Sequence, residues 1–200
     1  MVANIFQQNI VLEDQRTLLR PLVEEDIQYL LPFALNEPEI WPYALQNPAG
    51  ETGMRSWLER ALKNKSLGKD YPFIVFDKRA GKYAGSTRFS EIQMADKTTQ
   101  ISYSWYGKEF HRTGLNRHCK FLLLEFCFEK WEMERVEFRA DINNARSIEA
   151  LKAIGCTVEG ILRSDKLTDR GIRRSSMVFS VLKTEWFDGV KKSFKNKIYD

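Results

Sequence analysis

Apolar residues recur at intervals of three and four positions in three parts of the chain, and this spacing predicts amphipathic helices. The intervals join Met54, Trp57, Leu58, Ala61 and Leu62; Leu115, Cys119, Leu122, Leu123, Phe126 and Cys127; and Ile148, Leu151 and Ile154. Gly155 follows the third set and is the expected left-handed stop of that helix. A fourth helix is predicted after Pro21, because acidic residues occupy the start of the run VEEDIQYLLPFAL.

Short apolar runs and alternating patterns predict β-strands in the remaining segments. They are IVLEDQRTLLR, which is expected to form a strand pair; YPFIVFD, GSTRFSEI and QISYSWY from Tyr71 onward; RVEFRA; and the closing pair VEGILRSD and RRSSMVFSVLK. Because helices are inserted between strands, we expect an α/β fold with a mixed, mostly antiparallel sheet flanked by helices. No repeat or linker interrupts the chain, so residues 1–200 are predicted to form a single domain.

The composition is typical of a soluble globular protein in a reducing compartment. Hydrophobic residues make up 43% and charged residues 29% of the 200 residues. Cys119, Cys127 and Cys156 form no C-x-x-C pair, so neither a disulfide framework nor a zinc ribbon is expected. The chain start lacks a basic region followed by a long apolar stretch, and no window approaches the ~20 apolar residues that span a bilayer. We therefore expect a cytoplasmic protein with no membrane partner.

Several common catalytic and nucleotide-binding motifs are absent. The sequence contains no G-x-x-x-x-G-K-[ST], no G-x-G-x-x-G after a strand, no H-E-x-x-H and no G-x-S-x-G. With only His111 and His118 in the chain, neither a histidine-based triad nor a multi-histidine metal site is expected. The sequence therefore predicts no bound metal.

Much of the net charge of +4 lies in one stretch, KEFHRTGLNRHCK at residues 108–120, which holds four Lys or Arg against one Glu. The stretch joins a predicted strand to a long helix, whose first N–H groups lack partners within the helix and attract anions. Gly114 allows the backbone to approach a bulky phosphate, and Arg112, Arg117 and Lys120 add positive charge. These features favour a diphosphate site, and a plain turn with a solvated basic face is the alternative.

The order of segments resembles the GNAT family of acetyl-CoA-dependent N-acetyltransferases, and is most similar to its RimJ/RimL-like branch, the ribosomal-protein N-terminal acetyltransferases. The similar segments are LRPLVEEDI, GSTRF, HRTGLN leading into KFLLLEFCFEKWEMERVEFRAD, NARSIEALKAIGCTVEGILR, and GIRRSSMVFSVLKTEW. Together they cover nearly the whole chain. The resemblance implies a GNAT fold with a splay between its two central strands, acetyl-CoA as cosubstrate, and an amine acceptor.

The resemblance also implies which residues bind the cofactor. The pyrophosphate loop of the family, Q/R-x-x-G-x-G/A, falls on His111, Arg112, Thr113, Gly114, Leu115 and Asn116, of which only Gly114 matches cleanly. Asn144 matches the position whose amide contacts the pantetheine arm, and Ser147 follows it on the first turn of the helix. Capping of that helix is the alternative role of Asn144, and the two roles are compatible. Trp105 and Tyr106, at the end of the cofactor strand, complete the predicted cofactor-binding set.

In the mechanism that the resemblance implies, a neutral amine attacks the thioester directly, so the amine must first lose a proton. Glu91 is the leading candidate for the base, with Glu109 or a chain of waters as alternatives. A backbone N–H within residues 102–106 is suited to stabilise the thioester oxygen if that strand separates from RVEFRA. Many members of the family carry an acidic Tyr where this chain has Leu151. Ser147 is the nearest replacement, either as an acid or as a hydrogen-bond donor to the cofactor.

Acceptor choice is assigned to the irregular segment after the first helix, where Trp41 and Tyr43 are candidate substrate-binding residues. The acceptor is expected to be a protein N-terminus, such as that of a ribosomal protein, or a small-molecule amine, and both a monomer and a homodimer stay open. Two alternatives to the enzyme are a CoA-binding domain without catalysis and a basic module that binds ribosomes or nucleic acid. Acidic residues interrupt the other basic stretches, which disfavours nucleic acid as a partner.

Overall fold

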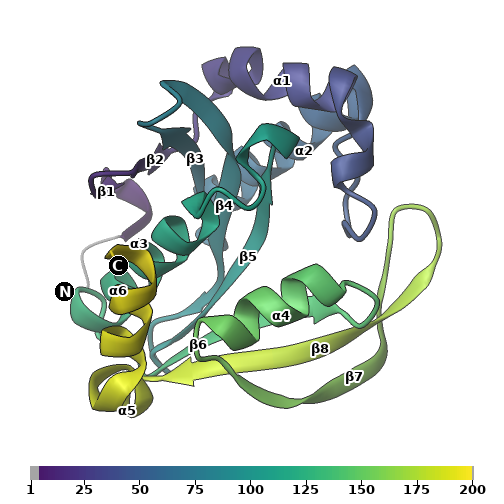
Figure 1. The fold of residues 1–200 in the computed structure, drawn as a ribbon. Helices are drawn as coiled ribbons and strands as arrows, with labels where there is room; N and C mark the ends of the chain where they lie inside the picture. Colours follow the sequence, from purple (N-terminus) through teal and green to yellow (C-terminus); the bar gives the residue numbers. More distant parts are fainter. Residues whose placement is uncertain (1–4, 200) are drawn as a thin grey trace.

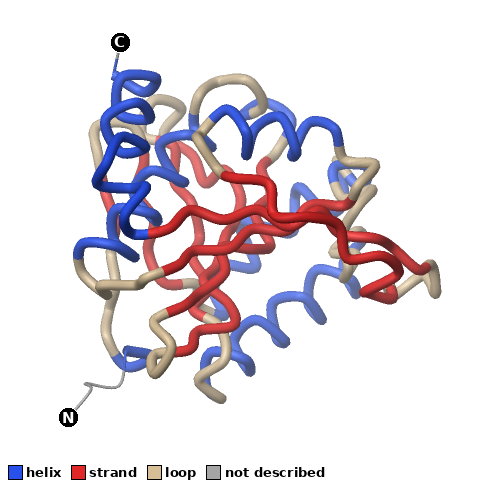
Figure 2. Tube along the Cα trace, turned by 90° about the horizontal axis from the view of Figure 1, so that it is seen from below, coloured by secondary structure: helices blue, strands red, loops and turns tan. Residues whose placement is uncertain are grey.

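Within residues 5–199, which the computed structural model describes, eight strands form one sheet with helices on both faces (Figures 1 and 2). The order of strands across the sheet is β1-β2-β3-β4-β5-β6-β8-β7. Neighbouring strands are antiparallel except β5 and β6, which are parallel. The predicted α/β fold with a mixed, mostly antiparallel sheet is therefore confirmed.

The elements follow the predicted order along the chain. The strands are β1 Leu12–Glu13, β2 Thr17–Pro21, β3 Tyr71–Asp77, β4 Lys82–Gln93, β5 Thr98–Tyr106, β6 Arg135–Asp141, β7 Thr157–Leu167 and β8 Arg173–Leu182. The helices are α1 Ile27–Asn36, α2 Gly50–Ser66, α3 Leu115–Glu129, α4 Ala145–Ala153, α5 Lys183–Glu185 and α6 Lys191–Tyr199. None of the helices in this described part is long and apolar enough to cross a membrane.

The sheet separates two hydrophobic cores. One core joins α1 and α2 to the sheet and includes Trp57, Ile74 and Trp105. The other lies under α3, α4 and α6 and includes Phe73 and Val75, whose side chains alternate along β3 with that of Ile74. Because both faces of the central strands are covered by helices, the run YPFIVFD is apolar at nearly every position rather than at every second one.

Strands β5 and β6 pair over only three residues and then separate. Residues 98–100 of β5 lie opposite residues 135–137 of β6, and the last pair is Gln100 with Glu137. Beyond this point β5 stays paired with β4 and β6 stays paired with β8. In Figure 1 the two halves of the sheet lie close together at the lower left and diverge toward the right. The predicted splay between the central strands is confirmed.

The end of the chain forms a helical segment that the sequence pattern did not predict. A π-helical turn, Trp186–Val190, continues α5 into α6. Trp186 is fully buried, and its indole N–H donates to Glu129 of α3 at 3.0 Å. Phe194 of α6 lies against Phe121 of α3, with ring centroids 5.6 Å apart. These contacts cover the outer side of α3 and fix the helix on the sheet.

A close approach between β4 and β5 depends on a glycine. A Cβ atom at Gly85 would lie 2.0 Å from the carbonyl oxygen of Trp105, and the φ of Gly85 is +155°. No side chain can be accommodated there without moving the backbone of β5, which carries Trp105 and Tyr106 to the edge of the splay.

We expect Gly85→Ala to destabilise the protein by roughly 1–3 kcal/mol, because the added methyl group overlaps a backbone oxygen. Gly81→Ala is the matched control, since Gly81 also has a positive φ of +66° but has nothing within 4 Å of a built Cβ. Urea unfolding of both variants measures the difference. Equal losses of stability would show that backbone conformation, and not the close approach to Trp105, governs the cost at Gly85.

Candidate active site

The splay opens into a cleft of about 1980 Å³ that is lined by residues from both halves of the sheet and from α3 and α4. Most of the predicted site residues line it: Trp41, Tyr43, Glu91, Trp105, Tyr106, His111, Arg112, Gly114, Asn116, Asn144 and Ser147. Thr113, Leu115 and Glu109 do not. The Leu115 side chain is fully buried in the core, and Glu109 lies outside the cleft, paired with Lys82 at 3.3 Å.

The loop that leads into α3 presents unused backbone donors. Arg112 and Gly114 both have left-handed conformations, with φ of +61° and +89°. The N–H groups of Arg112, Thr113, Gly114 and Asn116 make no hydrogen bond with any residue between 5 and 199. A Cβ atom built at Gly114 would meet nothing within 4 Å, so the space above the glycine is open. Successive free N–H groups at a helix start form an anion-binding concavity.

His111 ties this loop to the end of β5. Its Nε2 lies 2.9 Å from the carbonyl oxygen of Tyr106, and its Nδ1 lies 3.0 Å from a guanidinium nitrogen of Arg146 on α4. Burial, together with the positive charge of Arg146, lowers the pKa of His111, which favours the neutral ring. A neutral ring satisfies both contacts when Nε2 donates to Tyr106 and Nδ1 accepts from Arg146.

Asn144 caps the helix that forms the other wall of the cofactor side. Its side-chain oxygen accepts a hydrogen bond from the backbone N–H of Ser147 at 3.1 Å, as expected for an N-cap. The hydroxyl of Ser147 makes no hydrogen bond with a described residue, which leaves it free to donate into the cleft. The capping role that the sequence left open for Asn144 is present, and its amide nitrogen is also without a partner in this part of the chain.

A bulge shapes β5 above the splay. Arg88 of β4 lies opposite Ser102, and Ser86 lies opposite Trp105, so two residues of β5 face one of β4. Tyr103, one of these two, has a left-handed φ of +52°. On the side that faces β6, the backbone of residues 101–106 has no strand partner. Residues 102–106 are therefore at the edge that the sequence analysis selected for the thioester oxygen.

The acceptor-side candidates differ in exposure. Glu91 has a φ of +49° and is exposed, and its carboxylate makes no hydrogen bond with a described residue. Tyr43 is 38% exposed, but Trp41 is only 5% exposed and packs edge-on against Trp105, with ring centroids 5.0 Å apart. The side chain of Trp41 is therefore part of the core under α1 and α2, and only a small part of it faces the cleft.

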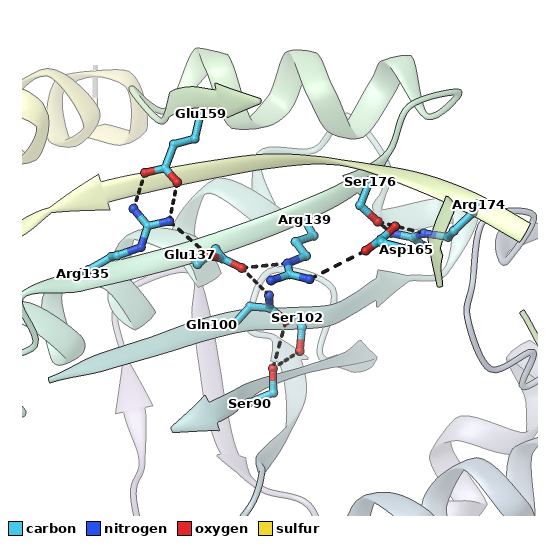
Figure 3. Close-up of polar contacts among 10 residues, drawn as sticks. All are labelled: Ser90, Gln100, Ser102, Arg135, Glu137, Arg139, Glu159, Asp165, Arg174 and Ser176. Carbon is cyan, nitrogen blue, oxygen red and sulfur yellow. Dashed lines mark hydrogen bonds and ion pairs between the residues drawn. The ribbon is translucent and has the colours of Figure 1, made fainter. Parts of the chain in front are cut away.

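Sequence reasoning missed a polar cluster at the closed end of the splay (Figure 3). Glu137 accepts hydrogen bonds from Gln100 at 2.9 Å, Arg139 at 2.7 Å and Arg135 at 3.1 Å. Burial alone would raise the pKa of Glu137, but the hydrogen bonds from Arg139 and Arg135 hold it below its usual value. The signal was present in RVEFRA, whose charged residues alternate with the apolar ones, but only the apolar face was interpreted.

Comparison with known proteins gives a family match over most of the chain. Residues 16–157 match the family described as acetyltransferase (GNAT) domain. The chain is 29% identical over 151 residues to "Putative ribosomal N-acetyltransferase YdaF" of Bacillus subtilis (strain 168), which covers 73% of this chain and 78% of that protein.

Solved structures agree with this match. The crystal structure of an acetyltransferase from T. thermophilus has a TM-score of 0.87 and 27% identity, with 100% of both chains covered. Mycobacterium smegmatis RimJ, solved in complex with CoA-disulfide, shares the fold at a TM-score of 0.75 and 18% identity, with 98% of this chain and 97% of that chain covered. The name of YdaF and the fold of RimJ support the resemblance to the RimJ/RimL-like branch. With the splayed sheet and the open loop before α3, these matches show that the chain belongs to the GNAT family of N-acetyltransferases, enzymes that transfer an acetyl group to an amine.

Proposed function

We propose that this enzyme transfers the acetyl group of acetyl-CoA directly to a primary amine while both substrates occupy the cleft. The observation that carries the proposal is the set of free N–H groups before α3, at the mouth of a cleft whose strand edge is unpaired. Acetyl-CoA supplies a diphosphate for the N–H groups and an acetyl thioester for the cleft. The residues present fit such a molecule.

The diphosphate is assigned to the loop from His111 to Asn116. The N–H groups of Arg112, Thr113, Gly114 and Asn116 supply donors, and the side chains of Arg112 and Arg117 at the cleft supply positive charge. The side chains of Thr113 and Leu115 point away from the cleft, so these two residues act through their backbone. His111 keeps the loop against the carbonyl of Tyr106 and is a positioning residue in this proposal.

The pantetheine arm is assigned to the gap between β5 and α4, and the thioester to the bulge of β5. Asn144 offers its amide nitrogen, while the backbone near Trp105 and Tyr106 offers groups that no strand pairs. A preorganised N–H directed at the thioester oxygen stabilises the negative charge that develops there when the amine attacks. No reorganisation is needed, because the bulge already separates this edge from the ladder with β4.

Glu91 is proposed to receive the proton of the acceptor amine, directly or through a water molecule. Its exposed carboxylate lies on the cleft and has no competing partner among residues 5–199. Ser147 is proposed to donate a hydrogen bond on the cofactor side, from the first turn of α4. Glu109 is not retained as a base, because its ion pair with Lys82 lies outside the cleft.

The acceptor opening lies between the loop after α1 and the hairpin of β7 and β8. The Asp169 N–H donates to the carbonyl of Leu45 at 3.1 Å, the Asp169 carboxylate accepts from the Asn47 N–H at 2.6 Å, and Arg174 donates to the carbonyl of Tyr43 at 3.0 Å. Tyr43 lies at this junction and is proposed to contact the acceptor. The proposed acceptor is the N-terminal amine of a protein or a small primary amine, and the name of YdaF favours ribosomal proteins as the first panel to screen.

Gly114→Val is expected to weaken CoA binding about tenfold or more, because the side chain fills the open space before α3. Gly171→Val is the matched control, since Gly171 also has a left-handed φ, +75°, with nothing within 4 Å, but lies in the β7–β8 hairpin. Calorimetry with CoA measures both variants. Near-normal affinity of a folded Gly114→Val protein would contradict the loop assignment, and no binding of CoA to the native chain at micromolar concentration would contradict the proposed function.

Ser147→Ala is expected to leave the helix cap intact, because the Ser147 N–H and not its hydroxyl bonds Asn144. If the hydroxyl acts in the transition state, kcat falls while the Kd for acetyl-CoA stays within about threefold of native. The measurement is thiol release with the most active amine from a panel of ribosomal-protein N-terminal peptides and small amines. An equal loss of turnover and affinity would instead assign the hydroxyl to ground-state binding.

A further inference from the structure

A buried lysine faces the cleft without a polar partner. Lys120, in the second turn of α3, is 7% exposed and lines the cleft. Its ammonium makes no hydrogen bond and no ion pair with any residue in the described range 5–199. Every other buried charged side chain in this range has a polar partner, as Arg88 has Asp70 and Asp26 has Arg20. An ammonium group held in this way is costly unless an anion completes its surroundings.

The ammonium lies close to the point where β5 and β6 separate. Its Nζ is 5.1 Å from the ring centroid of Phe138, and Phe138 follows Glu137, the last residue of β6 that pairs with β5. Phe138 belongs to the core under α3 and α4, so this is the cofactor side of the sheet. The lysine is more than one turn into α3, well past the free N–H groups before the helix that are assigned to the diphosphate.

The titratable groups beside Lys120 do not neutralise it. They are Cys119, its neighbour in α3, and Cys156, which follows α4. Burial raises the pKa of Cys119 to about 11 and that of Cys156 to about 12, so both are neutral thiols near pH 7. Burial also lowers the pKa of Lys120, which makes its proton easier to transfer than that of a solvated lysine.

We infer that Lys120 is the group that protonates the sulfur of CoA as it leaves, in place of the tyrosine that Leu151 replaces. The inference rests on the proposed function. The amine nitrogen forms its bond to the acetyl carbon and yields a proton on the Glu91 side, the carbon–sulfur bond breaks, and the sulfur takes its electron pair. A proton then passes from Lys120 Nζ to the sulfur, leaving CoA as a thiol and Lys120 as a neutral amine. Lys120 regains a proton from water after CoA leaves the cleft.

This assignment separates the tasks of Lys120 and Ser147. Lys120 carries a transferable proton and a full charge that stabilises a thiolate, whereas a serine hydroxyl must recover its own proton from another group before it can act again. Ser147 then serves to orient the cofactor from the start of α4, which is the second of the roles that the sequence analysis left open for it.

The test is the acidity of the thiol of bound CoA, which needs no acceptor amine. Thiolate absorbance in the ultraviolet is followed across pH for free CoA and for CoA bound to the native protein and to Lys120→Met. At the same pH, the fraction of thiolate in bound CoA is expected to be about tenfold higher with the native protein than with Lys120→Met. Lys152→Met is the matched control, because Lys152 of α4 is exposed and bonds only Glu149, and it should behave as native.

Equal thiol acidity in the native and Lys120→Met complexes, with CoA bound to both, overturns the role of Lys120 and leaves the proposed function standing. A loss of CoA affinity of about tenfold or more in Lys120→Met assigns the lysine to a phosphate or the pantetheine arm and also overturns it. Failure of the native protein to bind CoA overturns both proposals.

A second measurement needs no variant. Native protein should bind CoA more tightly than desulfo-CoA, and the ratio should grow as pH rises through the titration of the bound thiol. A ratio that stays constant with pH contradicts a charge on Lys120 facing the sulfur.

Discussion

After Gln100 and Glu137, two strands that elsewhere would form a continuous ladder turn their edges to a cleft instead of to each other. Backbone N–H and C=O groups at such an edge need partners, and within a protein the cost of leaving them unpaired is large. Strong pairing of β5 with β4 and of β6 with β8 keeps each half in place despite this loss. The cleft is therefore a permanent part of the sheet, and an extended substrate arm with its own amide groups is the natural occupant.

The closed end of the splay explains how the opening is maintained. Glu137 collects three donors there, and Arg135 also bonds Glu159 of β7, so a filled polar cluster stands on one face while Phe138 and Lys120 stand on the other. The alternation of RVEFRA thus gives the two faces of one strand opposite characters. On the cofactor side an ammonium stands against an apolar ring, and on the acceptor side the charges are dense and paired.

Much of this arrangement was predictable, because it follows from local pattern. The helix periods, the apolar face of Val136 and Phe138, the glycine before α3 and the N-x-x-S run all acted through residues close in sequence. Contacts across the sheet were not predictable. Nothing local indicates that Lys120 is buried, since its place in a basic stretch favours an exposed cation, or that Trp41 packs on Trp105. The C-terminal helix was missed because its apolar residues are few and widely spaced, and it is held by Trp186 and Phe194 against α3.

The bridge between Asp169 and the loop at Leu45 and Asn47 has a consequence for how this chain can change. Both segments are connections at the rim, and neither belongs to the loop before α3 or to the helix that Asn144 caps. Insertions and replacements at the rim can therefore accumulate without disturbing the donor of the acetyl group. Selectivity for the amine and use of the acetyl donor are inherited separately, so a new acceptor specificity can be grafted by exchanging two short connections as a pair.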